Sequence, residues 1–206
     1  MHHSMVDHNP FISKGYTVYD AESVLDRFTE AGIDLVLTGH VHVQDISERT
    51  KLRGTFRDIA TNALSVYPHQ YGKIVVSTRK RLFSYQTIPV DVEVWAHENK
   101  IKDTRLTGFR SYSDLFFRDR SAFMVGRMLS LGAVQIPRDR ATAMTELFGT
   151  LNARFFAGNA FLNASDTVQT GTYRELVSTD YGFLSLYAQS IVEDPSPENN
   201  RLEIDF

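Results

Sequence analysis

The first forty residues contain one helical and one strand-like pattern of apolar positions. A helix is predicted over residues 21–31, with Asp20 placed to cap its start and Gly32 placed to end it. Its apolar positions share one face: Val24, Leu25, Phe28 and Ala31. Residues 33–38 then form a short apolar run that stops at a glycine, which is typical of a buried strand. A helix that leads into a buried strand indicates an α/β unit.

Short β-like segments follow this unit. Residues 55–60 and 73–78 are rich in β-forming residues, and residues 81–95 alternate in places. The alternation places three valines on one face: Val90, Val92 and Val94. These segments predict antiparallel strands and hairpins.

The second half of the chain has helical periodicity. A helix is predicted over residues 113–131, a second one after Pro137, and a third one over residues 179–192. The pattern therefore predicts an α+β protein with three segments. These are an α/β region over 1–100, a polar linker over 101–112 and a helical domain over 113–206.

The composition limits the kinds of functional site and partner that the chain can have. The 206 residues are 42% hydrophobic and 23% charged, which is typical of a folded globular protein. The absence of cysteine excludes disulfides, thiolate-ligated metals and cysteine nucleophiles. A net charge of −3 argues against a nucleic-acid polymer as partner. Because no run of about 18 apolar residues occurs, we expect no membrane span. The cytoplasm is the default location, with export or the cell envelope left open.

All seven histidines lie between His2 and His97, which confines any histidine chemistry to the first half. The strand predicted over 33–38 runs into Gly39, His40 and His42. In extended backbone, two residues spaced i, i+2 share a face, so both histidines can point at one metal centre. Ligands also bind beyond the carboxyl ends of strands in α/β sheets. The alternative is a pair of solvated loop histidines.

The segments MHHSMVDHNPF and LVLTGHVH, with the helix between them, resemble the C-terminal half of calcineurin-like metallophosphoesterases over residues 1–96. In that family a histidine after an apolar strand and a later G-H-x-H supply metal ligands. The resemblance implies that His2 and His40 bind one divalent metal ion and take part in catalysis. His42 would bind a second ion, and the ions would be manganese, iron or zinc. It also implies half of the family's α/β sandwich.

Further residues near these motifs are candidates for the substrate pocket. His3, Asp7 and His8 are expected to line it, although a simple turn is the alternative for Asp7 and His8. Gln44 and Asp45 are candidates for orienting the metal-bound imidazoles, or else exposed loop residues.

Several motifs of the family are missing from this sequence. The patterns D-x-H, G-D-x-x-D and G-N-H-[DE], which carry the other ligands and the bridging carboxylate, do not occur. We therefore expect a partial form with weak or no activity, whose open sheet edge is covered by an N-terminal half or by a second copy.

The resemblance implies hydrolysis of a small phosphate ester, most similar to bacterial phosphodiesterases with a helical C-terminal extension. Two other hypotheses stay open. One is a non-catalytic remnant or interaction module, and the other is an enzyme with a single metal on three histidines. The helical region is expected to pack on itself and on the sheet, or to shape a substrate cleft or a dimer interface.

Overall fold

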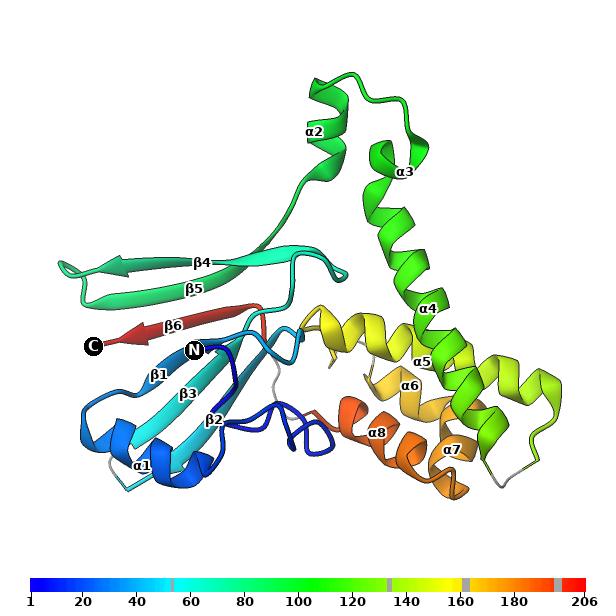
Figure 1. The fold of residues 1–206 in the computed structure, drawn as a ribbon, viewed down its shortest axis with the longest axis horizontal. Coiled ribbons are helices and arrows are strands. Elements are labelled where there is room, and N and C mark those ends of the chain that lie inside the picture. The colour runs from blue at the N-terminus through cyan, green and yellow to red at the C-terminus, as the bar shows by residue number, and fades with distance from the viewer. Residues whose placement is uncertain (53, 133–134, 161–163, 195–197) are drawn as a thin grey trace.

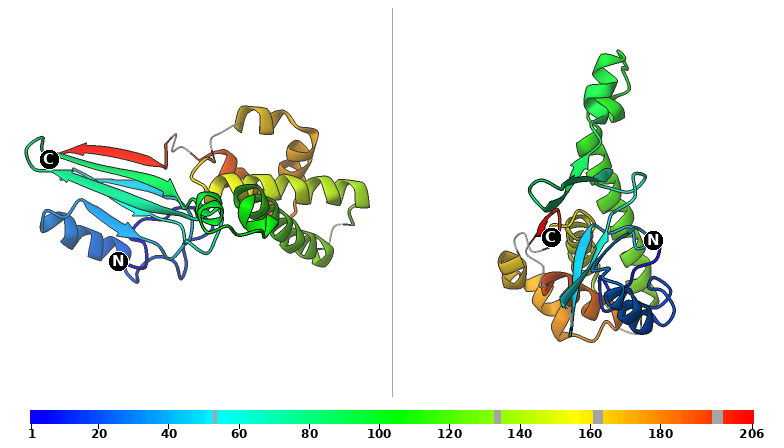
Figure 2. Two further views of the ribbon diagram at one scale, coloured as in Figure 1. Left: turned by 90° about the horizontal axis from the view of Figure 1, so that it is seen from above. Right: turned by 90° about the vertical axis from the view of Figure 1, so that its left-hand side faces the viewer.

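A computed structural model describes residues 1–52, 54–132, 135–160, 164–194 and 198–206. The elements of the described chain follow in this order: α1 (Ala21–Glu30), β1 (Leu35–Thr38), β2 (Asp45–Lys51), β3 (Gly54–Ala60), β4 (Gln70–Ser77), β5 (Leu82–Pro89), α2 (Val92–Glu98), α3 (Thr104–Thr107), α4 (Phe109–Leu131), α5 (Arg138–Phe156), α6 (Ala164–Gln169), α7 (Gly171–Ser178), α8 (Phe183–Val192) and β6 (Arg201–Asp205). The fold is α+β, as the sequence predicts. The sheets lie at one end of the molecule and helices α4 to α8 at the other (Figures 1 and 2).

The first sheet has the strand order β1-β3-β2, with β1 parallel to β3 and β2 antiparallel to β3. Helix α1 covers one side of it and buries Leu25 against Val36 and Phe56. Met5 and Val6 from the N-terminal segment complete this small core. The predicted helix and buried strand are thus confirmed, and Gly32 follows the helix in the left-handed conformation, which suits glycine. The prediction that Asp20 caps the helix is wrong, because its side chain forms no capping hydrogen bond.

The second sheet has the order β4-β5-β6, and all its pairs are antiparallel. Strand β6 enters this sheet after the whole helical region has been traversed (Figure 1). The buried Tyr85 of β5 packs against Ile46 and Ile59 of the first sheet, so apolar side chains join the two sheets.

The helical region packs around α5 and α8. The largest core cluster buries Phe148, Phe155 and Ile191 together with Val41 and Val43, which follow β1. This shared core attaches the helices to the loop that carries the G-H-x-H motif. Within the described residues, no helix combines the length and apolar character that crossing a membrane requires.

The secondary-structure prediction is wrong in places. Residues 92–95 form the start of α2 and not a strand, because Asp91 caps a helix by accepting the backbone N–H of Val94 at 3.0 Å. The region 101–112, predicted as a polar linker, contains α3 and the beginning of α4. The two helices α2 and α3 project away from the rest of the molecule (Figures 1 and 2). The placement of domain boundaries stays a prediction.

Candidate functional site

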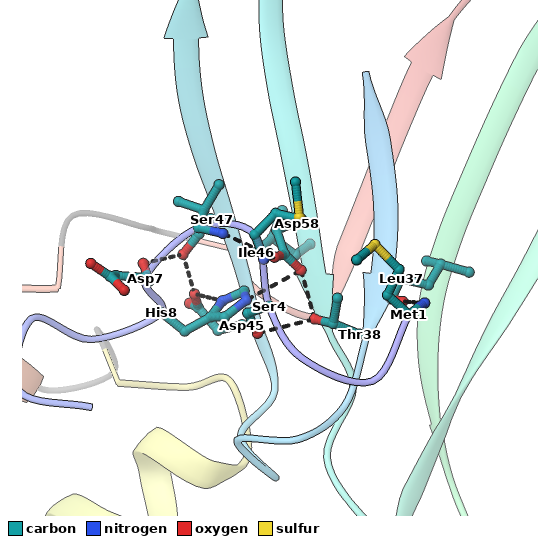
Figure 3. Close-up of polar contacts among 12 residues, drawn as sticks. Met1, Ser4, Asp7, His8, Leu37, Thr38, Asp45, Ile46, Ser47 and Asp58 are labelled. Atoms are coloured by element: carbon teal, nitrogen blue, oxygen red, sulfur yellow. Dashed lines mark hydrogen bonds and ion pairs between the residues drawn. The ribbon is translucent and has the colours of Figure 1, made fainter. Parts of the chain in front are cut away.

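The N-terminal segment lies beside the carboxyl end of β1. The terminal amino group of Met1 donates to the carbonyl of Leu37 at 2.7 Å (Figure 3). The carbonyl of His2 accepts the backbone N–H groups of Gly39 at 3.2 Å and His40 at 3.0 Å. Main-chain hydrogen bonds therefore bring together two motifs that are 38 residues apart in the sequence.

Three imidazole rings meet at this point, and we call His2, His3 and His40 the histidine cluster. His40 Nδ1 lies 2.8 Å from His2 Nε2, which is hydrogen-bond distance. The ring centroid of His40 lies 4.6 Å from that of His2 and 4.2 Å from that of His3. The ring of Tyr16, 5.3 Å from His40, borders the cluster.

The surroundings of His40 favour its neutral form. Partial loss of water contact lowers its pKa, and the like charges that His3, His2 and His42 would carry lower it further. A neutral imidazole is the form that binds a metal ion, because a ring nitrogen must offer its lone pair. The cluster therefore favours the ligand form of His40.

His42 does not lie in extended backbone. Residues 39–42 form a turn, in which the His42 N–H donates to the Gly39 carbonyl at 3.3 Å. His42 itself has a φ of 59° and is exposed. The expectation that His40 and His42 share a strand face is thus wrong, because the strand ends at Thr38. His42 remains close enough for its charge to act on His40.

The donor set fits part of a metal centre. Two imidazole nitrogens that bind one zinc ion at about 2.1 Å lie roughly 3.0–3.4 Å apart. The separation of 2.8 Å between His2 and His40 is close to this range. No three side chains of His, Cys, Asp or Glu are arranged to hold a metal within the part of the chain that the structure describes. A two-metal centre that uses His2, His40 and His42 therefore stays a prediction.

A buried carboxylate lies between the N-terminal segment and the end of β1 (Figure 3). Asp58 of β3 is fully buried, and its Oδ2 accepts the backbone N–H groups of Met5 at 2.5 Å and Val6 at 3.1 Å. Its Oδ1 accepts the hydroxyl of Thr38 at 2.6 Å, and Thr38 Oγ1 lies 3.3 Å from Ser4 Oγ. Asp58 thus joins the N-terminal segment to the end of β1.

His8 is buried between two carboxylates. Its Nδ1 lies 2.7 Å from Asp45 Oδ2, and its Nε2 lies 3.3 Å from Asp58 Oδ1. The second contact lacks hydrogen-bond geometry and acts through charge. Burial alone would lower the pKa of His8, but the two carboxylates outweigh it and raise the pKa to about 9. Burial alone would raise the pKa of Asp58, but His8 and its other donors lower it.

The other two predicted pocket residues, Asp7 and His8, contact residues outside the histidine cluster. The carboxylate of Asp7 points away from the buried network, while its main-chain carbonyl accepts the hydroxyl of Ser47 at 3.2 Å (Figure 3). Asp7 and His8 do line one surface pocket, together with Asn9 and Glu48. A substrate role for His3, Asp7 and His8 stays a prediction, and the imidazole of His8 is engaged in the buried ion pairs.

Gln44 and Asp45 are buried and not exposed loop residues. Asp45 holds His8 and not an imidazole of the histidine cluster. Gln44 accepts the hydroxyl of Tyr85 at 3.0 Å and so connects the two sheets.

Sequence reasoning missed Asp58 and Thr38. A signal for Asp58 exists, because aspartate is depleted in strands and this one lies between the buried Phe56 and Ile59. Its partners could not be read from the sequence, because they come from residues 4–6, 8 and 38.

Comparison with known proteins identifies the helical part of the chain. Residues 91–198 match the family model described as the C-terminal domain of cyclic nucleotide phosphodiesterase. The match begins at the cap of α2 and extends past α8, so it lies outside the histidine cluster. A search of curated proteins gave no match. The match covers slightly more than half of the sequence, and the chain belongs to the family of the C-terminal domain of cyclic nucleotide phosphodiesterase.

Proposed function

We propose that the chain is the histidine-bearing part of a metal-dependent phosphodiesterase, in which His2 and His40 hold one divalent metal ion and His42 contacts a second. The approach of His2 Nε2 to His40 Nδ1, at 2.8 Å, carries this proposal. Membership in a phosphodiesterase-related family supports the reaction class. We also propose that the substrate is a small phosphate ester.

Each residue of the histidine cluster has a separate role in this proposal. His40 supplies a neutral imidazole, since its pKa is lowered. To His3, which is exposed beside it, we assign contact with the phosphate or protonation of the leaving oxygen. When bound, manganese, iron or zinc would polarise the phosphate and lower the pKa of a coordinated water. The exposed ring of Tyr16 adds an apolar surface at the edge of the cluster.

Metal content tests the proposal. The chain is stripped with a chelator and dialysed against Mn²⁺ or Zn²⁺, and the metal per chain is then measured. His2→Ala and His40→Ala should each weaken binding by more than about 100-fold, because the loss of a ligand exceeds the roughly 10–100-fold effect of outer-shell changes. His97→Ala is the matched control, since His97 is exposed on α2.

The same preparations test the reaction. Hydrolysis of an aryl phosphodiester with added Mn²⁺ should be weak in the wild-type chain and lost in His2→Ala. A wild-type chain that binds neither metal would overturn the proposal in favour of a non-catalytic interaction module. Metal binding that survives both substitutions would also contradict it.

A further inference from the structure

A buried polar connection joins the N-terminal segment to the end of β1, and we call Asp58 with its donors the Asp58 clamp. The donors are the N–H groups of Met5 and Val6 and the hydroxyl of Thr38. Asp58 is fully buried, and its carboxylate contacts two segments that each lead to one histidine of the cluster (Figure 3). The first segment carries His2 and the second carries His40.

The sheet fixes the place of the clamp. Strands β1 and β3 run parallel, with Val36 opposite Asp58. Thr38 follows Val36 by two residues and so faces the same side of the sheet. Asp58 therefore reaches the last residue of β1, after which Gly39 and His40 follow at once.

The clamp adds a buried anchor to a segment that Met1 and His2 already tie to the end of β1 through main-chain hydrogen bonds. The main chain of Ser4 pairs with the segment from Tyr16 to Val18, and the N–H groups of the next two residues both donate to Asp58. Hydrogen bonds to an ionised carboxylate are shorter and stronger than those between neutral groups. An amide at position 58 would turn one acceptor into a donor, which opposes the donors already there.

We propose that Asp58 is a positioning residue for the histidine cluster, holding His2 against His40 through the backbone of Met5 and Val6 and through Thr38. For its effect on metal binding this inference rests on the proposed function. The alternative is a purely structural role, in which Asp58 stabilises the fold without setting the His2–His40 distance.

Asp58→Asn in the full chain separates the two roles. Asp34→Asn is the matched control, because Asp34 is exposed and lies just before the opposite end of β1. The first measurement is the imidazole ¹⁵N spectrum of the metal-free protein, which reports the His2–His40 hydrogen bond. The second is the Zn²⁺ dissociation constant from competition with a chelator, with circular dichroism as the check on folding.

The folded Asp58→Asn protein should lose the His2–His40 hydrogen bond and bind Zn²⁺ about 10–100-fold more weakly, whereas Asp34→Asn stays within about twofold of wild type. A folded Asp58→Asn protein with an unchanged hydrogen bond and unchanged affinity would overturn the inference. If wild type binds no Zn²⁺, the proposed function fails, while the imidazole spectrum still decides the positioning role.

A second pair of variants covers the case in which Asp58→Asn does not fold. Thr38→Val removes the hydroxyl and keeps the side-chain shape, and Thr38→Ser keeps the hydroxyl. Thr38→Val should weaken the His2–His40 hydrogen bond, and Thr38→Ser should restore it. Equal spectra for the two variants would contradict the clamp.

Discussion

Two histidine environments in the first 42 residues behave in opposite ways. The histidine cluster is at the surface, and the pKa of His40 is lowered there. His8 has a side chain that is 1% exposed, and its pKa is raised to about 9. The difference lies in the neighbours: other imidazoles surround His40, whereas two carboxylates flank His8.

This contrast separates a chemical role from a structural one. The lowered pKa of His40 favours its neutral imidazole, which keeps a ring lone pair available for a metal or a proton. The carboxylates of Asp45 and Asp58 raise the pKa of His8 to about 9, which favours a buried cation that bridges them at neutral pH. Burial by itself lowers the pKa of both histidines, and at His8 the two neighbouring carboxylates reverse that effect.

The largest expected effect comes from removing the buried cation. His8→Ala leaves Asp45 and Asp58 close together without a counter-charge in the protein interior. Breaking a buried pair in this way costs about 3–5 kcal/mol. We therefore expect the free energy of unfolding at pH 7, measured by urea denaturation, to fall by that amount.

The matched variant is His40→Ala. It removes a partly exposed imidazole whose neighbours disfavour its charge, so its stability should stay within about 0.5 kcal/mol of wild type. Equal losses in the two variants would contradict the division into a structural and a chemical histidine.

The next effect is a loss of stability at alkaline pH. The pKa of His8 is about 9 in the folded chain against 6.5 for the unperturbed side chain. A raised pKa gives a contribution that is complete below pH 6.5 and is lost as the pH rises through 9. The shift corresponds to about 3 kcal/mol, and the lowered pKa of Asp58 reflects the same pair and is not added to it.

Unfolding free energies between pH 6 and pH 10 measure this loss. Asp45→Asn removes one of the two carboxylates and should flatten the pH dependence, because the pKa of His8 then falls. A wild-type stability that stays constant up to pH 10 would show that His8 is neutral in the folded protein.

Much of the fold could be predicted because the regular spacing of apolar residues in long segments indicates their secondary structure. The helix ending at Gly32 and the strand after it follow from apolar spacing, and so does most of α4. Strand β2 was missed, because its segment DISERTK is mostly polar and forms a strand only by pairing with β3. Strand β6 was missed because it forms by pairing with β5, which lies far earlier in the sequence.

The candidate site was likewise predicted only in part. The sequence predicted that His2 and His40 meet, and the structure places their nitrogens 2.8 Å apart. It did not predict that His8 turns inward, because the motif DHN says nothing about Asp58, which is fifty residues away in the chain. A backbone turn removed His42 from the predicted strand face, and local spacing alone cannot show such a turn.

The smallest expected effect concerns the titration of the histidine cluster in the metal-free chain. The pKa of His40 is lowered in part by the charges that His2 and His3 would carry. His3→Ala removes one of these charges, so the titration midpoint of His40, followed by NMR, should move up toward the ordinary value of 6.5. The midpoint of His8 should not change, because Asp45 and Asp58 set it. A His40 midpoint that is unchanged in His3→Ala would mean that loss of water contact alone lowers its pKa, and the contrast between the two environments would then rest on His8.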